Sequence, residues 1–150
     1  MNDQVAWTWP VIWELEDALW DLAPRALERE GLREILAQAA RELLLLQSSD
    51  WQFIISTGEV ADYAIRRFNG HASDTRKLLE ALLEGLDGRG IERGLRLARE
   101  LQLRDDVFRD ILPSVEWAVR ADGRRHASDD RRQTTGGRRQ AADALESTSP

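Results

Sequence analysis

The fold is decided by residues 32–47, LREILAQAARELLLLQ. Apolar residues recur here at three- and four-residue intervals, with Gln38, Arg41 and Glu42 among the polar residues between them. An α-helix repeats every 3.6 residues, so this spacing gathers the apolar side chains on one face and the polar ones on the other. We therefore predict a central helix whose apolar face is well buried.

Helical spacing continues on the N-terminal side of this segment. Apolar positions from Pro10 onward predict an amphipathic first helix, because proline suits the first helical turn, and we place Trp20 on its core side. Pro24 is expected to open a short second helix that Gly31 ends.

On the C-terminal side, residues 51–55 are an apolar run that fits either a short helix or a strand. We predict a helix, capped by Asp50, because no other segment offers a strand partner. Residues 60–83 then predict one long helix kinked at 69–70, or two helices. A glycine-rich loop, a weaker helix around 95–103, an irregular segment and a last helix capped by Ser114 complete the body.

These elements define an all-α protein. We expect a compact bundle of about five to seven helices over residues 1–120, since every connection in this range is short. Residues 121–150 contain six arginines, five acids and almost no large apolar side chain, which predicts a disordered polar tail.

Composition excludes several classes of function. The longest apolar run, residues 43–46, is too short to cross a membrane, and the absence of cysteine fits a cytoplasmic location. A net charge of −6, with the acidic excess in the body, disfavours nucleic acid. With two histidines and no cysteine, we predict no metal and no cofactor.

Catalytic constellations are weak. Ser56, His71 and Asp74 could be assembled into a triad on paper, but no nucleophile elbow surrounds any serine. Glycosyl chemistry needs two carboxyl groups facing each other across a bond, whereas the paired acids of this chain are neighbours that predict solvated helix surfaces.

Tryptophan is the unusual residue of this chain, with six against three phenylalanines and one tyrosine. A flat indole can stack on the apolar face of a sugar ring, although tryptophan is more often simply core. Tyr63, Arg67 and His71 follow at four-residue spacing, which places them on one helix face that could bind a polyol beside Trp51. The alternative is a buried tyrosine and a histidine that merely satisfies a neighbour.

Three segments carry a resemblance to a known family: Trp7-Thr8-Trp9-Pro10, the run Ser49-Asp50-Trp51-Gln52-Phe53, and the Tyr63, Arg67, His71 series. Over about residues 4–118 the chain resembles the C-terminal helical domain of the family-57 glycoside hydrolase type of 1,4-α-glucan branching enzyme. Gln52 stands where family members often have proline.

The resemblance implies a role in α-glucan (glycogen) biosynthesis. In that family the catalytic Glu and Asp lie on an incomplete β/α barrel that precedes the helical domain, so this chain would have no catalytic residue of its own. It implies a helical accessory domain, inactive alone, that packs on a barrel encoded separately or lost and lines the glucan cleft. The implied glucan contacts are Trp9, Trp51 and Trp7, with Tyr63, Arg67 and His71 beside them. The alternative is a free-standing α-glucan-binding or scaffold module.

Overall fold

The computed structural model describes residues 3–58 and 60–123. Five labelled helices follow one another: α1 Thr8–Leu27, α2 Glu30–Leu46, α3 Ser49–Thr57, α4 Ala61–Leu86 and α5 Ile91–Arg104. The chain is helical again over 111–123, and the described ranges contain no strand. The predicted all-α class is confirmed.

The chain divides into two compact units, residues 1–115 and 116–150. Of the second unit only 116–123 are described, and they are helical. The predicted disordered tail, 121–150, lies outside the described residues except for 121–123, which continue this helix. Among the described helices, none combines the length and the apolar character that a membrane span requires.

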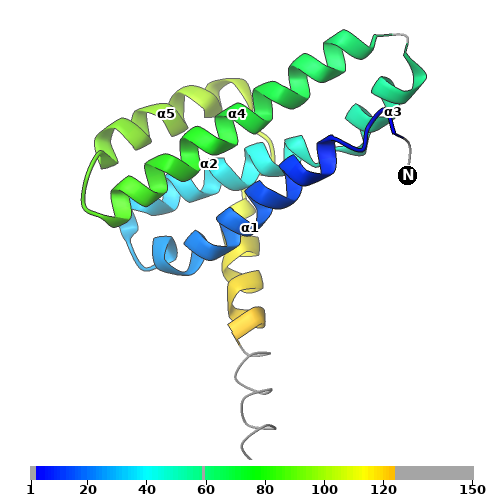
Figure 1. Ribbon diagram of the computed structural model, residues 1–150. Helices are drawn as coiled ribbons and strands as arrows, with labels where there is room; N and C mark the ends of the chain where they lie inside the picture. The colour runs from blue at the N-terminus through cyan, green and yellow to red at the C-terminus, as the bar shows by residue number, and fades with distance from the viewer. Residues whose placement is uncertain (1–2, 59, 124–150) are drawn as a thin grey trace, which may run out of the picture. The chain divides into compact units, whose positions relative to one another are not determined.

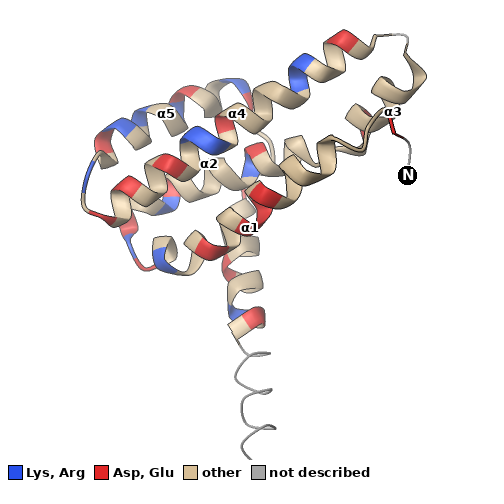
Figure 2. Ribbon diagram, viewed as in Figure 1, with Lys and Arg blue, Asp and Glu red and all other residues tan. Residues whose placement is uncertain are grey.

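Helices α2 and α4 form the centre of the first unit (Figure 1). Helix α4 contacts each of the other four labelled helices, and α2 contacts α1, α4 and α5. The short α3 packs on α4 near the start of the chain, where Val5, Ile55 and Ala64 form a small apolar cluster. Charged residues of both signs mark the outer side of α5 (Figure 2).

The predicted central helix is α2, but it is buried on more sides than the sequence pattern indicates. Leu32, Ile35 and Leu36 are fully enclosed, as expected. Gln38, Arg41 and Glu42, which we assigned to the polar face, are 1%, 6% and 0% exposed. The reason is that α1, α4 and α5 all pack against this one helix.

Two expected helix boundaries are wrong. Pro24 does not open a second helix but lies inside α1, which continues to Leu27. Proline costs the helix one backbone hydrogen bond, and burial of Ala23 and Ala26 on either side supports the last turn. Gly31 lies in the first turn of α2 rather than ending a helix.

The caps and one aromatic also differ from expectation. The N-cap of α3 is Ser48, and Asp50 lies in the first turn, where a negative charge suits the helix dipole. Ser114 falls within a helix that has already begun at 111. Trp20 is 40% exposed, so it is not a core residue of α1.

Candidate functional site

The predicted polar series lies on one continuous helix, because Tyr63, Arg67 and His71 all belong to α4. Of the two arrangements left open for residues 60–83, the single helix is the one observed. The three side chains differ in depth. Tyr63 is 49% exposed, Arg67 is half-buried and His71 is 1% exposed. The series therefore runs from solvent into the core.

Trp51, on α3, is held against this series. Its ring lies 6.0 Å from the His71 ring, centroid to centroid, at 32°. Its Nε1 donates a hydrogen bond to the Leu45 carbonyl oxygen at 2.7 Å, and the side chain also packs on the Val5, Ile55 and Ala64 cluster. The indole is half-buried, so it is fixed in place while part of it still reaches solvent.

Trp7 and Trp9 stand at the start of α1. The Trp7 ring meets the buried Phe68 of α4 edge-on, with centroids 5.1 Å apart, and remains 39% exposed. Phe68 and His71 are one turn apart on α4, so Trp7 and Trp51 lie against neighbouring turns of the same helix. Trp9 is half-buried with its ring 6.1 Å from that of Trp13.

The structure therefore brings Trp7, Trp51, Arg67 and His71 to the N-terminal half of α4. Tyr63 lies in the first turn of the same helix. Trp9 pairs with Trp13 along α1.

A buried polar network beneath this face was missed by sequence reasoning. Glu42 Oε2 lies 2.8 Å from His71 Nδ1, and Glu42 Oε1 accepts from Gln38 Nε2 at 3.1 Å. A carboxylate only accepts, so Nδ1 is the protonated nitrogen of the imidazole. Asp105, 7% exposed, lies 3.9 Å from the Arg67 guanidinium. The available signal was a polar run at positions 38, 41 and 42 inside the most apolar segment.

Arg104 joins three carboxylates of this network. It donates to Asp74 at 2.8 Å and to Asp105 at 2.6 Å, and its Nη2 lies 3.8 Å from Glu42 Oε1. Burial raises the pKa of Asp74, but hydrogen bonds from Arg104 and Lys77 outweigh it and hold that pKa below its usual value. The bond to Asp74 raises the pKa of Arg104 in turn.

Arg41 ties the segment after α5 to α2. Its Nε donates to the Val107 carbonyl at 2.9 Å and its Nη2 to the Arg109 carbonyl at 3.3 Å. Between these two carbonyls Phe108 has φ +51°, the one positive φ among the described non-glycine residues. A bulky residue rarely adopts this conformation. The buried arginine therefore holds a strained turn.

The structure does not bring Ser56, His71 and Asp74 together as a catalytic triad. Ser56 is exposed and donates to the Phe53 carbonyl within α3. His71 pairs with Glu42, and Asp74 pairs with Arg104 and Lys77.

Glu42, His71 and Asp105 each offer a ligand atom, and these atoms all lie within 4.8 Å of one another, which is a spacing that suits a metal ion. The Arg104 guanidinium already bonds Asp105, and Arg67 lies beside it, so a further cation would meet two positive charges.

The spacing of Glu42 and Asp105 also approaches the roughly 5 Å that separates the two carboxyl groups of retaining glycosidases. Both acids are enclosed and share Arg104, which leaves no open side for a sugar. We interpret the network as one that positions α2, α4 and residues 105–109.

Comparison with known proteins shows the family. The family model described as "1,4-alpha-glucan branching enzyme, C-terminal" matches residues 12–115. The crystal structure of a GH57-type branching enzyme from Pyrococcus horikoshii superposes with a TM-score of 0.63 at 40% identity, covering 72% of this chain and 20% of that one. The class is thus a helical domain of a carbohydrate-active enzyme. The chain belongs to the C-terminal domain family of 1,4-α-glucan branching enzymes.

Curated relatives agree. The chain is 38% identical over 112 residues to a 1,4-α-glucan branching enzyme of Thermococcus kodakarensis, covering 74% of this chain and 16% of the relative. The structure of that GH57 enzyme, in complex with glucose and additives, gives a TM-score of 0.64 at 37% identity and covers 73% of this chain and 20% of that one. A probable branching enzyme of Mycobacterium tuberculosis is 48% identical over 48 residues, 32% of this chain and 9% of the relative. The chain thus spans a fifth or less of the length of these relatives.

Proposed function

We propose that this chain is the helical accessory domain of a family-57 type 1,4-α-glucan branching enzyme and that it binds α-glucan. In this proposal the sugar contacts are Trp7, Trp9 and Trp51, with Tyr63 and Arg67 supplying polar contacts. Family membership supports an α-glucan as the ligand, and the placement of Trp7, Trp51 and Arg67 around α4 supports this face. A cytoplasmic location and a role in glycogen biosynthesis belong to the same proposal.

The observation that carries the proposal is the fixed, half-exposed ring of Trp51. A hydrogen bond to the Leu45 carbonyl and the contact with His71 hold the indole before any ligand arrives. A platform that is already in place loses little conformational entropy on binding. One face of a pyranose presents C–H groups that an indole can cover, while its hydroxyls need polar partners.

His71 has a specific place in this proposal. It is enclosed and bonded to Glu42, so it does not meet the sugar directly in this arrangement. We assign it a positioning role, because it fixes the Trp51 ring from below. Arg67, half-buried one turn earlier on α4, is the cation that can turn toward a hydroxyl.

We further propose that a catalytic barrel is the protein partner of these helices and that the helices do not catalyse branching by themselves. The buried acids Glu42, Asp74 and Asp105 are all committed to Arg104, His71 or Lys77. A retaining displacement needs one free nucleophilic carboxylate and one acid facing it across the scissile bond. If no barrel partner exists, the same face would serve a free-standing glucan-binding module.

The test is a titration of maltoheptaose followed by tryptophan fluorescence. We expect weak, saturable binding on the order of millimolar, because one exposed face covers one side of a sugar. Trp51→Ala should remove the part of the response that arises at this face. Trp117→Phe, at a 68% exposed position in the other unit, should leave it unchanged. Equal responses from wild type and Trp51→Ala would contradict the proposed face.

A further inference from the structure

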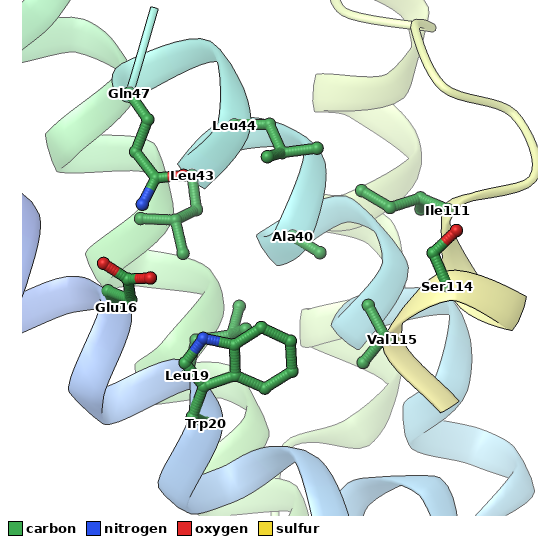
Figure 3. A pocket seen from close by; sticks show the side chains of 10 residues that line it. All are labelled: Glu16, Leu19, Trp20, Ala40, Leu43, Leu44, Gln47, Ile111, Ser114 and Val115. Carbon is green, nitrogen blue, oxygen red and sulfur yellow. The ribbon is translucent and has the colours of Figure 1, made fainter. Parts of the chain in front are cut away.

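A groove lies between α1, α2 and residues 111–115 (Figure 3). Its volume is about 160 Å³. Trp20 forms one wall, Ala40 and Leu43 of α2 lie opposite, and Ile111 and Val115 close the far side. At roughly 30 Å³ for each water molecule, the space corresponds to about five waters. That size suits a single ring and is too small for a helix.

The rim of this groove carries three polar side chains. The side chains of Glu16 and Gln47 stand at one end and that of Ser114 at the other. Within the described part of the chain, none of these three side chains makes a hydrogen bond or ion pair. An apolar occupant would leave the hydrogen-bonding capacity of these side chains unused. A ligand with an apolar face and a hydroxyl edge would satisfy both the floor and the rim.

We infer that this groove is a second α-glucan subsite that takes one glucosyl residue. The indole of Trp20, 40% exposed, covers the C–H face of the sugar ring. Glu16 accepts from hydroxyls, Gln47 both donates and accepts, and Ser114 serves either role. The inference rests on the proposed glucan binding but involves none of the residues of the Trp51 face, so the two sites can fail separately.

The indoles of the two sites are held in place by different contacts. Trp51 is anchored by its own hydrogen bond and by His71. Trp20 stands on the outward side of α1 and is met by residues of α2 and of 111–115. A glucan held at both sites would contact the domain through two separated sugar units, which raises overall affinity through effective concentration.

The experiment is a proton–nitrogen NMR titration of the full chain with maltotriose, observing the six indole N–H signals. Trp20→Phe and Trp51→Phe assign the two signals that matter. We expect the Trp20 signal to shift saturably. Gln47→Ala should weaken binding at Trp20 about tenfold while leaving the Trp51 response unchanged, and Gln102→Ala on α5 should alter neither.

Each outcome discriminates. A Trp51 signal that moves while Trp20 stays fixed overturns this inference and leaves the proposed function standing. A Trp20 signal that moves alone supports the groove and contradicts the Trp51 face, and two fixed signals contradict both. A Trp20 shift produced equally by glycerol at matched hydroxyl concentration also overturns the inference, since it would reflect a general polyol effect.

Discussion

Glu42 of α2 and His71 of α4 meet in the core, with Oε2 2.8 Å from Nδ1 and exposures of 0% and 1%. The same imidazole lies under the ring of Trp51. A contact between the two central helices therefore also sets the position of an aromatic residue that reaches the surface. This relationship links the stability of the bundle to its proposed binding face.

Glu42→Ala should lower the free energy of unfolding by about 3 kcal/mol, because removing one member of a buried polar pair leaves the other unsatisfied. Urea unfolding measures this loss. Glu42→Gln is the matched control, since the amide oxygen can still accept from Nδ1, and it should cost less. Equal losses from both variants would show that the hydrogen bond to His71 is not what matters.

Phe108→Gly should raise the free energy of unfolding by about 1 kcal/mol, because glycine adopts a positive φ without strain. Thermal unfolding of the two proteins is the measurement. Val107→Gly, one residue earlier and outside the positive-φ region, is the control and should not stabilise. If both glycines lower stability alike, the turn is not strained.

Gly94→Ala should destabilise by about 1–3 kcal/mol. An added Cβ would lie 2.7 Å from the Ile35 Cδ1 atom and 3.1 Å from the Ala81 Cβ, so the enclosed Ile35 side chain or α5 itself would have to shift. Gly70→Ala is the matched control on α4, where a Cβ meets nothing within 4 Å. That change should stabilise by up to about 1 kcal/mol through helix propensity. The prediction fails if the two substitutions shift the unfolding midpoint in the same direction.

Acid should remove the stabilisation that Asp74 supplies. Its pKa is lower in the folded protein than its ordinary 3.8, so its contribution is complete above that value and is lost as the pH falls through the lowered pKa. Asp74→Asn should therefore lower the free energy of unfolding at neutral pH. It should also make that free energy fall less steeply as the pH is lowered into the acid range. Asp110→Asn, at an exposed position, should leave the acid dependence of the unfolding free energy as it is in wild type. If Asp74→Asn shows the same acid dependence of the unfolding free energy as wild type, the stabilising bond between Asp74 and Arg104 is contradicted.

The sequence predicted the parts of the fold that follow from apolar spacing. The central helix at 32–47, the helical choice for 51–55 and the shared helix of Tyr63, Arg67 and His71 all agree with the structure. Spacing alone did not predict Pro24 inside a helix, because burial of the neighbouring side chains compensates for the backbone hydrogen bond that proline cannot donate.

The polar network escaped prediction for a related reason. Pattern reasoning assigns residues such as Arg41 and Glu42 to the solvent face, yet partners from α4 and 105–109 compensate their burial. These partners are about 30 to 70 positions away in sequence. The prediction for Trp20 is wrong in the opposite sense. Its apolar ring was expected in the core, but it lines the groove on the outside of α1.

The most direct test of glucan binding is native gel electrophoresis with glycogen cast into the gel. We predict that the chain is retarded relative to a gel without glycogen, that Trp51→Ala migrates faster than wild type in the glycogen gel, and that an albumin standard is unaffected. Identical mobility of the wild-type chain with and without glycogen, at polysaccharide concentrations well above the millimolar range in glucosyl units, would contradict the claim that this domain binds α-glucan.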